Sequence, residues 1–130
     1  MRIEHIAIWT NDLERLRTFY ESYFGATANQ KYVNPRKGFS SYFLTFSSGA
    51  RLELMQRADI QAIEKGPEEE VLGYAHFAME VGDETAVDQL TQRLVDDGVP
   101  LLDGPRYTGD GYYESVILDP DGNRIEITAQ

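Results

Sequence analysis

The sequence is short of several residue types and patterns, and each shortage excludes a class of protein. None of its 130 residues is cysteine, which excludes a disulfide scaffold, a thiolate zinc site and cysteine nucleophilic catalysis. Its 12 basic and 22 acidic residues give a formal net charge of −10, which disfavours nucleic-acid and anionic-membrane partners. No apolar run approaches the roughly 20 residues that span a bilayer, and the N-terminus has no apolar signal core. We therefore expect a soluble, cytoplasmic protein of one domain.

The sequence nevertheless holds enough apolar material for one core. Hydrophobic residues make up 42% of the chain and aromatic residues 12%, and a chain of this length buries about two thirds of the surface that it exposes when unfolded. Short β-branched runs alternate with two amphipathic helical patterns. The spacing predicts strands over 2–9, 26–33, 39–47, 50–56, 73–81, 99–103, 112–118 and 123–128, and helices over 13–24 and 84–97.

Polar residues mark where the two helices begin, and a glycine follows each. Asn11 or Asp12 is expected to cap the first helix, and Asn11 has the spacing of a capping box with Glu14. Asp83 is expected to cap the second helix. Residues 57–73 have the composition of a solvated connector, with room for one helical turn over 58–64.

The two halves of the sequence repeat one pattern. His5 and His76 lie 71 residues apart, each inside the first strand of its half. Glu53 and Glu126 lie 73 residues apart, each inside the last strand, and the glycine, arginine and aliphatic residues around them also match. We therefore expect an α+β protein of tandem βαβββ modules that form one joint domain. The expected parts are a first module over 1–56, a connector over 57–73 and a second module over 74–130.

Both histidines and both glutamates fall on the strand face opposite the aliphatic residues, because side chains alternate along a strand. A carboxylate in the middle of a strand is costly to bury without a partner, and imidazole with carboxylate is a ligand set for zinc, nickel, cobalt or iron(II). The pattern predicts one divalent metal ion on His5, Glu53, His76 and Glu126. In the alternative reading the four lie apart, and each glutamate pairs with the arginine two residues before it, Arg51 or Arg124.

Several stretches spread over nearly the whole chain resemble the vicinal oxygen chelate superfamily, and within it glyoxalase I and related lyases. The residues that carry the resemblance are 3–8, 19–20 with 24–25, 52–54, 74–78 and 118–127, and the element over 119–126 is the most specific. The resemblance implies a half-open mixed β-barrel flanked by helices, a homodimer and a small-molecule substrate. It implies one divalent ion per site, Zn or Ni first and then Co, Mn or Fe, on His5, Glu53, His76 and Glu126.

The resemblance also implies a reaction, namely proton transfer next to a carbonyl through a metal-stabilised enediolate. The substrate would be a thiol hemithioacetal or another small carbonyl compound. Glu126 and Glu53 are the candidate general bases, and the family favours Glu126. Two other hypotheses remain: another metal enzyme of the superfamily, such as an epimerase, thiol transferase or dioxygenase, and a non-catalytic protein that binds a small molecule.

Two positions depart from bacterial glyoxalase I, which typically has arginine and asparagine there to bind glutathione; here they hold Trp9 and Arg57. We expect Trp9 to be an apolar wall of the substrate site, unless it is a packed core residue. We expect Arg57 to bind a substrate carboxylate, unless it is a solvated cation. Tyr112 and Tyr113 end the glycine-rich stretch 104–113 and are candidates to line the same cleft, unless the stretch is an ordinary hairpin connection.

One loop is basic within this acidic protein. Residues 29–38 hold three basic residues and no acidic one. Such a loop can steer an anionic substrate toward a nearby site, and in the alternative reading it is only a solvated loop.

Overall fold

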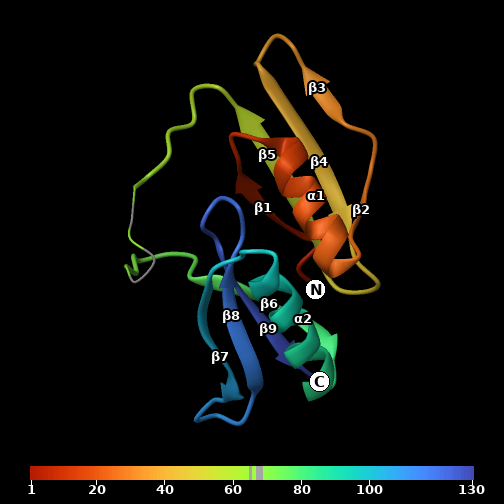
Figure 1. Cartoon of the computed structure of the whole chain (residues 1–130). Helices are drawn as coiled ribbons and strands as arrows, with labels where there is room; N and C mark the ends of the chain where they lie inside the picture. The colour runs from red at the N-terminus through yellow and green to blue at the C-terminus, as the bar shows by residue number, and fades with distance from the viewer. Residues whose placement is uncertain (65, 67–68) are drawn as a thin grey trace. The chain divides into compact units, whose positions relative to one another are not determined.

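The computed structural model describes residues 1–64, 66 and 69–130. Its elements divide between two units, Met1–Ile63 and Glu64–Gln130, and each unit packs one helix against one sheet (Figure 1). The expected α+β class is confirmed. Within the described ranges, no helix is both long enough and apolar enough to cross a membrane.

The sheet of the first unit mixes one parallel pair with antiparallel pairs. The unit consists of β1 (His5–Trp9), α1 (Leu13–Phe24), β2 (Thr27–Ala28), β3 (Tyr32–Asn34), β4 (Phe39–Thr45) and β5 (Arg51–Arg57). The strand order is β1-β5-β4-β2, with β3 also paired to β4 and with β1 parallel to β5. The expected single strand over 26–33 is wrong, because Asn29 interrupts it. The Asn29 side chain accepts the backbone N–H of Phe43 at 2.8 Å, in place of a ladder carbonyl.

The second unit repeats this topology. It consists of β6 (His76–Gly82), α2 (Glu84–Asp96), β7 (Leu101–Tyr107), β8 (Tyr113–Leu118) and β9 (Arg124–Ala129). The strand order is β6-β9-β8-β7, and β6 is parallel to β9 as β1 is to β5. The internal repeat inferred from the sequence is therefore confirmed in the fold. Residues 58–64, which had room for one helical turn, contain no helix, and residues 65, 67 and 68 of the expected connector lie outside the described residues.

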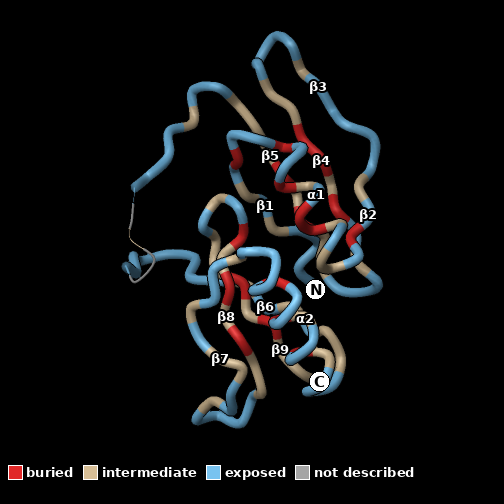
Figure 2. Tube along the Cα trace, viewed as in Figure 1, coloured by how far each residue is buried: buried red, intermediate tan, exposed pale blue. Residues whose placement is uncertain are grey.

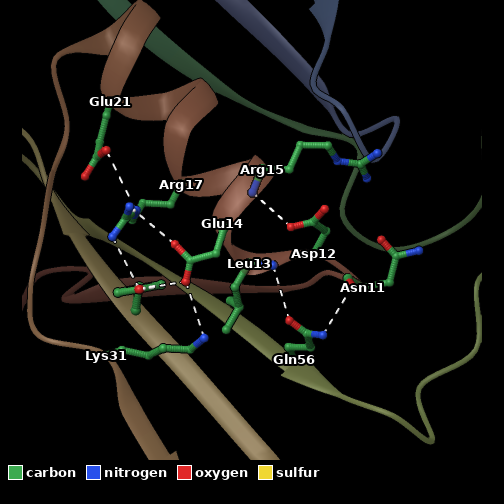
Figure 3. A network of polar contacts seen from close by, with 10 residues as sticks. Asn11, Asp12, Leu13, Glu14, Arg15, Arg17, Glu21, Lys31 and Gln56 are labelled. Atoms are coloured by element: carbon green, nitrogen blue, oxygen red, sulfur yellow. Dashed lines mark hydrogen bonds and ion pairs between the residues drawn. The ribbon is translucent and has the colours of Figure 1, made fainter.

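Helix α1 is capped by Asp12 and not by Asn11. The Asp12 carboxylate accepts the backbone N–H of Arg15 at 3.0 Å, which satisfies one donor of the first turn. The expected capping box between Asn11 and Glu14 is therefore wrong. Glu14 instead turns toward the sheet, where its Oε1 accepts the O–H of Tyr42 on β4 at 2.8 Å. Figure 3 shows the network of ion pairs and hydrogen bonds that ties this end of α1 to the sheet.

Each sheet buries one face against its own helix. Leu52 and Leu54 of β5 and Ile125 and Ile127 of β9 are at most 4% exposed, while the residues between them are half-exposed. Figure 2 places the buried segments on the helices and on the central strands of each unit. A fully buried aliphatic side chain contributes about 1.5–3 kcal/mol, so this face holds helix to sheet. The predicted alternation of side chains between the two strand faces is confirmed. The face of each sheet that carries the histidine and the glutamate is left uncovered by its helix.

Candidate functional site

His5 and Glu53 meet on the open face of the first sheet. Strands β1 and β5 are parallel with His5 opposite Arg51 and Ala7 opposite Glu53, so the imidazole and the carboxylate are diagonal neighbours. His5 Nε2 lies 3.7 Å from Glu53 Oε2. Phe43 of β4 packs edge-on against the imidazole with ring centroids 5.3 Å apart. The side chain of His5 is 39% exposed and that of Glu53 is 15% exposed, so a solute can reach both.

The second unit repeats this arrangement on its own sheet. His76 lies opposite Arg124 and Ala78 lies opposite Glu126, which is the register of the first pair. His76 Nε2 lies 3.1 Å from Glu126 Oε1. The neighbouring Arg124 donates through Nη1 to Glu70. The repeat in the sequence thus produces two matching imidazole–carboxylate pairs.

Each unit brings together two of the four predicted ligands. Among the residues that the structure describes, no group of three or more histidine, aspartate or glutamate side chains is placed to hold a metal ion. Each unit thus presents one imidazole–carboxylate pair on the open face of its own sheet.

Glu4 holds the His5 ring from its other side. Glu4 Oε2 lies 2.5 Å from His5 Nδ1, and Glu4 Oε1 accepts from Arg51 Nε at 2.7 Å. The hydrogen bond with His5 is the main reason why the pKa of the Glu4 carboxyl is lowered. Metal-binding histidines commonly bond their second nitrogen to a carboxylate, which fixes the ring orientation. Arg51, considered above as a partner of Glu53, here pairs with Glu4.

The two expected substrate-binding residues of the first unit are in contact. The Arg57 guanidinium lies over the indole of Trp9, 5.3 Å from the ring centroid, and Phe39 meets the indole edge-on at 6.2 Å. Trp9 is 38% exposed and is therefore not a core residue. Arg57 Nε donates to Asp59 at 2.5 Å, so its guanidinium is held and is not merely solvated.

The tyrosine candidates of the second unit are placed differently. Tyr113 lies on the helix face of β8, and its O–H donates to Asp88 of α2 at 2.7 Å. This hydrogen bond is the main cause that raises the pKa of Tyr113 to about 12. Tyr113 therefore faces away from Glu126, while Tyr112 is exposed just before β8. The expected loop over 104–113 consists of the end of β7, a turn and the first residue of β8.

Sequence reasoning missed Glu114, a carboxylate on the open face of the second sheet. Glu114 pairs with Thr128 of β9 and so shares a face with Glu126. Burial is the main cause that raises its pKa, and the charge of Glu126 adds to the effect. The alternation of side chains along the strand could have identified it. Glu114 points to the face opposite that of its neighbour Ser115, which is fully buried on the helix side.

Comparison with known proteins gives the family of this chain. Residues 2–127 match the model of the Glyoxalase/Bleomycin resistance protein/Dioxygenase superfamily. The uncharacterized protein YqjT of Bacillus subtilis (strain 168) is 26% identical over 134 residues, which cover 98% of each chain. The trypanothione-dependent glyoxalase I of Leishmania major is 25% identical with a TM-score of 0.78, over 99% of this chain and 86% of that one. Glyoxalase I from Zea mays shares the fold at 22% identity and a TM-score of 0.78, and this chain spans 44% of its length. The chain therefore belongs to the Glyoxalase/Bleomycin resistance protein/Dioxygenase superfamily.

Proposed function

We propose that this protein is a divalent-metal-dependent lyase or isomerase of the glyoxalase type, acting on a thiol hemithioacetal or another small carbonyl compound. The observation that carries the proposal is the repeated His–Glu pair on an open sheet face, in a chain that has no third histidine. Likeness to a trypanothione-dependent glyoxalase I supports chemistry on a thiol adduct.

The donor atoms of both pairs fit a divalent ion. Imidazole nitrogen and carboxylate oxygen are donors that zinc and nickel accept. Two ligands that each lie about 2.1 Å from a tetrahedral ion stand about 3.4 Å apart, and the observed separations are 3.7 and 3.1 Å. The proposed ligands are His5, Glu53, His76 and Glu126, supplied by one chain or by two chains of a homodimer.

The chemistry needs a group that moves a proton beside a carbonyl. A bound divalent ion supplies Lewis-acid polarisation of the substrate carbonyl oxygen. Glu126, or Glu53 as its repeat equivalent, accepts the proton from the carbon next to that carbonyl and returns it to the substrate. The side chains of Glu126 and Glu53 are 20% and 15% exposed, which leaves them accessible but partly desolvated, as suits a base.

The test is metal analysis followed by turnover assays. We expect about one zinc or nickel ion per chain after purification, whether the ligands of a site come from one chain or from two chains of a homodimer. Metal-free protein should be inactive with hemithioacetals of methylglyoxal and regain activity on addition of zinc or nickel. Thiols for the assay include glutathione, trypanothione and cysteine. Protein that takes up no ion, and that turns over none of the adducts, would instead favour a non-catalytic binding protein.

A further inference from the structure

A row of aromatic rings lies at one end of the open face in the first unit. Tyr32 of β3, Phe39 of β4 and Trp9 of β1 follow one another across the sheet. The ring centroids of Tyr32 and Phe39 are 6.1 Å apart, and those of Phe39 and Trp9 are 6.2 Å apart. Tyr32 is 53% exposed and Trp9 is 38% exposed. Aromatic surface that is left exposed in a continuous row offers a ligand a stacking or edge-on contact.

Arg57 lies on β5, between the strands of Trp9 and Phe39, and its side chain is held in place. Its guanidinium lies over Trp9 at 5.3 Å from the ring centroid, and its Nε donates to Asp59 at 2.5 Å. Within the described part of the chain these contacts leave the two terminal amino groups of Arg57 without a hydrogen-bond partner. A guanidinium binds a carboxylate through two parallel hydrogen bonds, and one that is already held in place loses little freedom on binding.

The surroundings of Arg57 carry further positive charge, although the whole chain has a net charge of −10. The turn between β3 and β4 exposes Arg36 and Lys37. This turn connects Asn34 to Phe39, which pair with each other, and Phe39 lies opposite Arg57. The basic loop noticed in the sequence therefore adjoins Arg57, and its field attracts an anion to this end of the sheet.

We propose that the aromatic–arginine platform, defined as Tyr32, Phe39, Trp9 and Arg57, binds an aromatic carboxylate. The rings receive the planar group, and the terminal amino groups of Arg57 receive the carboxylate. The platform shares its sheet face with His5 and Glu53, because Trp9 follows His5 and Arg57 follows Glu53 by four strand residues. Four residues of strand span about 13 Å.

The substrate of the enzyme is accordingly an elongated aromatic acid whose reactive carbonyl lies about 13 Å from its carboxylate end. This extension rests on the proposed function, since it places the carbonyl at the His5–Glu53 pair. Binding of an aromatic acid to the platform does not rest on it, because no metal and no turnover are involved.

The experiment uses the intrinsic fluorescence of Trp9, which is the only tryptophan of the chain. Metal-free protein is titrated with phenylacetate, with the neutral analogue phenylacetamide and with the saturated analogue cyclohexylacetate. Phenylacetate should bind about tenfold more tightly than the amide, which cannot form the charged pair. It should also bind about threefold more tightly than the saturated acid, which lacks the ring contacts. Equal binding of acid and amide, or no change of fluorescence with any of the three, would overturn the proposal.

Variants locate the site. Arg57→Gln should weaken phenylacetate binding about tenfold. Arg57→Lys should weaken it less, because lysine keeps the positive charge and loses only the two parallel hydrogen bonds of the guanidinium. Arg93→Gln removes the same charge from α2 and serves as the matched control, with unchanged binding expected. Circular dichroism confirms that each variant is folded. An Arg57→Gln protein that binds phenylacetate like the parent refutes the platform, whereas an absence of lyase activity would count only against the proposed function.

Discussion

The substitution His76→Ala distinguishes a metal ligand from a structural residue. The side chain of His76 is 43% exposed on the open face of β6, where it lies 3.1 Å from Glu126. Pairs with this exposure contribute about 0–1 kcal/mol to folding. A loss of 1 kcal/mol lowers the melting temperature by roughly 4 °C in a domain of this size. We therefore expect the melting temperature of His76→Ala to fall by less than about 4 °C.

Ile127 provides the contrast, because it belongs to the other face of the same sheet. It is fully buried on the side that packs against α2. Truncation of a buried isoleucine to alanine costs about 2–5 kcal/mol. Ile127→Ala should therefore lower the melting temperature by roughly 8–20 °C. The two variants are compared by thermal melts followed by circular dichroism.

For metal affinity, the larger loss should occur in His76→Ala and not in Ile127→Ala. His76→Ala removes a proposed ligand, and even changes around a ligand cost 10–100-fold in metal affinity, so we expect a loss of at least about 100-fold for zinc. Ile127→Ala should keep the parent affinity at a temperature where it is folded. Competition with a chromophoric chelator measures both constants. A folded His76→Ala protein with the parent affinity would refute the ligand assignment, and a larger loss of stability in His76→Ala than in Ile127→Ala would refute the face assignment.

Three further predictions concern the backbone at Gly104, the thiol part of the substrate and the phenol of Tyr113. Gly104 has φ +80° and an added Cβ would stand 2.4 Å from the carbonyl oxygen of Glu114, so Gly104→Ala should lower the melting temperature by more than about 8 °C. Gly109→Ala, whose Cβ meets nothing within 4 Å, is the control and should melt like the parent. The glutathione adduct of methylglyoxal should be a poor substrate, because Trp9 and Arg57 replace the arginine and asparagine that the resemblance to glyoxalase I leads us to expect for glutathione binding, and a kcat/KM of about 10⁶ M⁻¹s⁻¹ or more would contradict this. The phenol of Tyr113 has its pKa raised to about 12 by the hydrogen bond to Asp88, so this bond supports the fold below pH 10 and is lost as the pH rises through 12. Asp88→Asn should return the pKa toward the ordinary value near 10, as measured by phenolate absorbance, and an unchanged titration would disprove the assignment.

The order of residues along the chain was enough to predict the faces of the strands and the internal repeat. Alternation along a strand is a local property, so the separation of His5 and His76 from the aliphatic residues followed from their positions alone. The same rule could have identified Glu114, which shares the open face with Glu126. The strand expected over 26–33 failed because Asn29 takes a hydrogen bond from Phe43, a residue of another strand.

Which of these side chains meet depends on how the strands are arranged in space. The diagonal approach of His5 to Glu53, the stacking of Arg57 on Trp9 and the row that Phe39 completes all depend on strand order and register. Tyr113, a candidate for the substrate cleft by sequence, turns instead to Asp88, a residue 25 positions away in the chain. Register is fixed by the packing of whole strands and their helix, and a shift by one residue would move every side chain to the opposite face. A local pattern therefore predicts which face a residue occupies, whereas its neighbours on that face are set by contacts between distant segments.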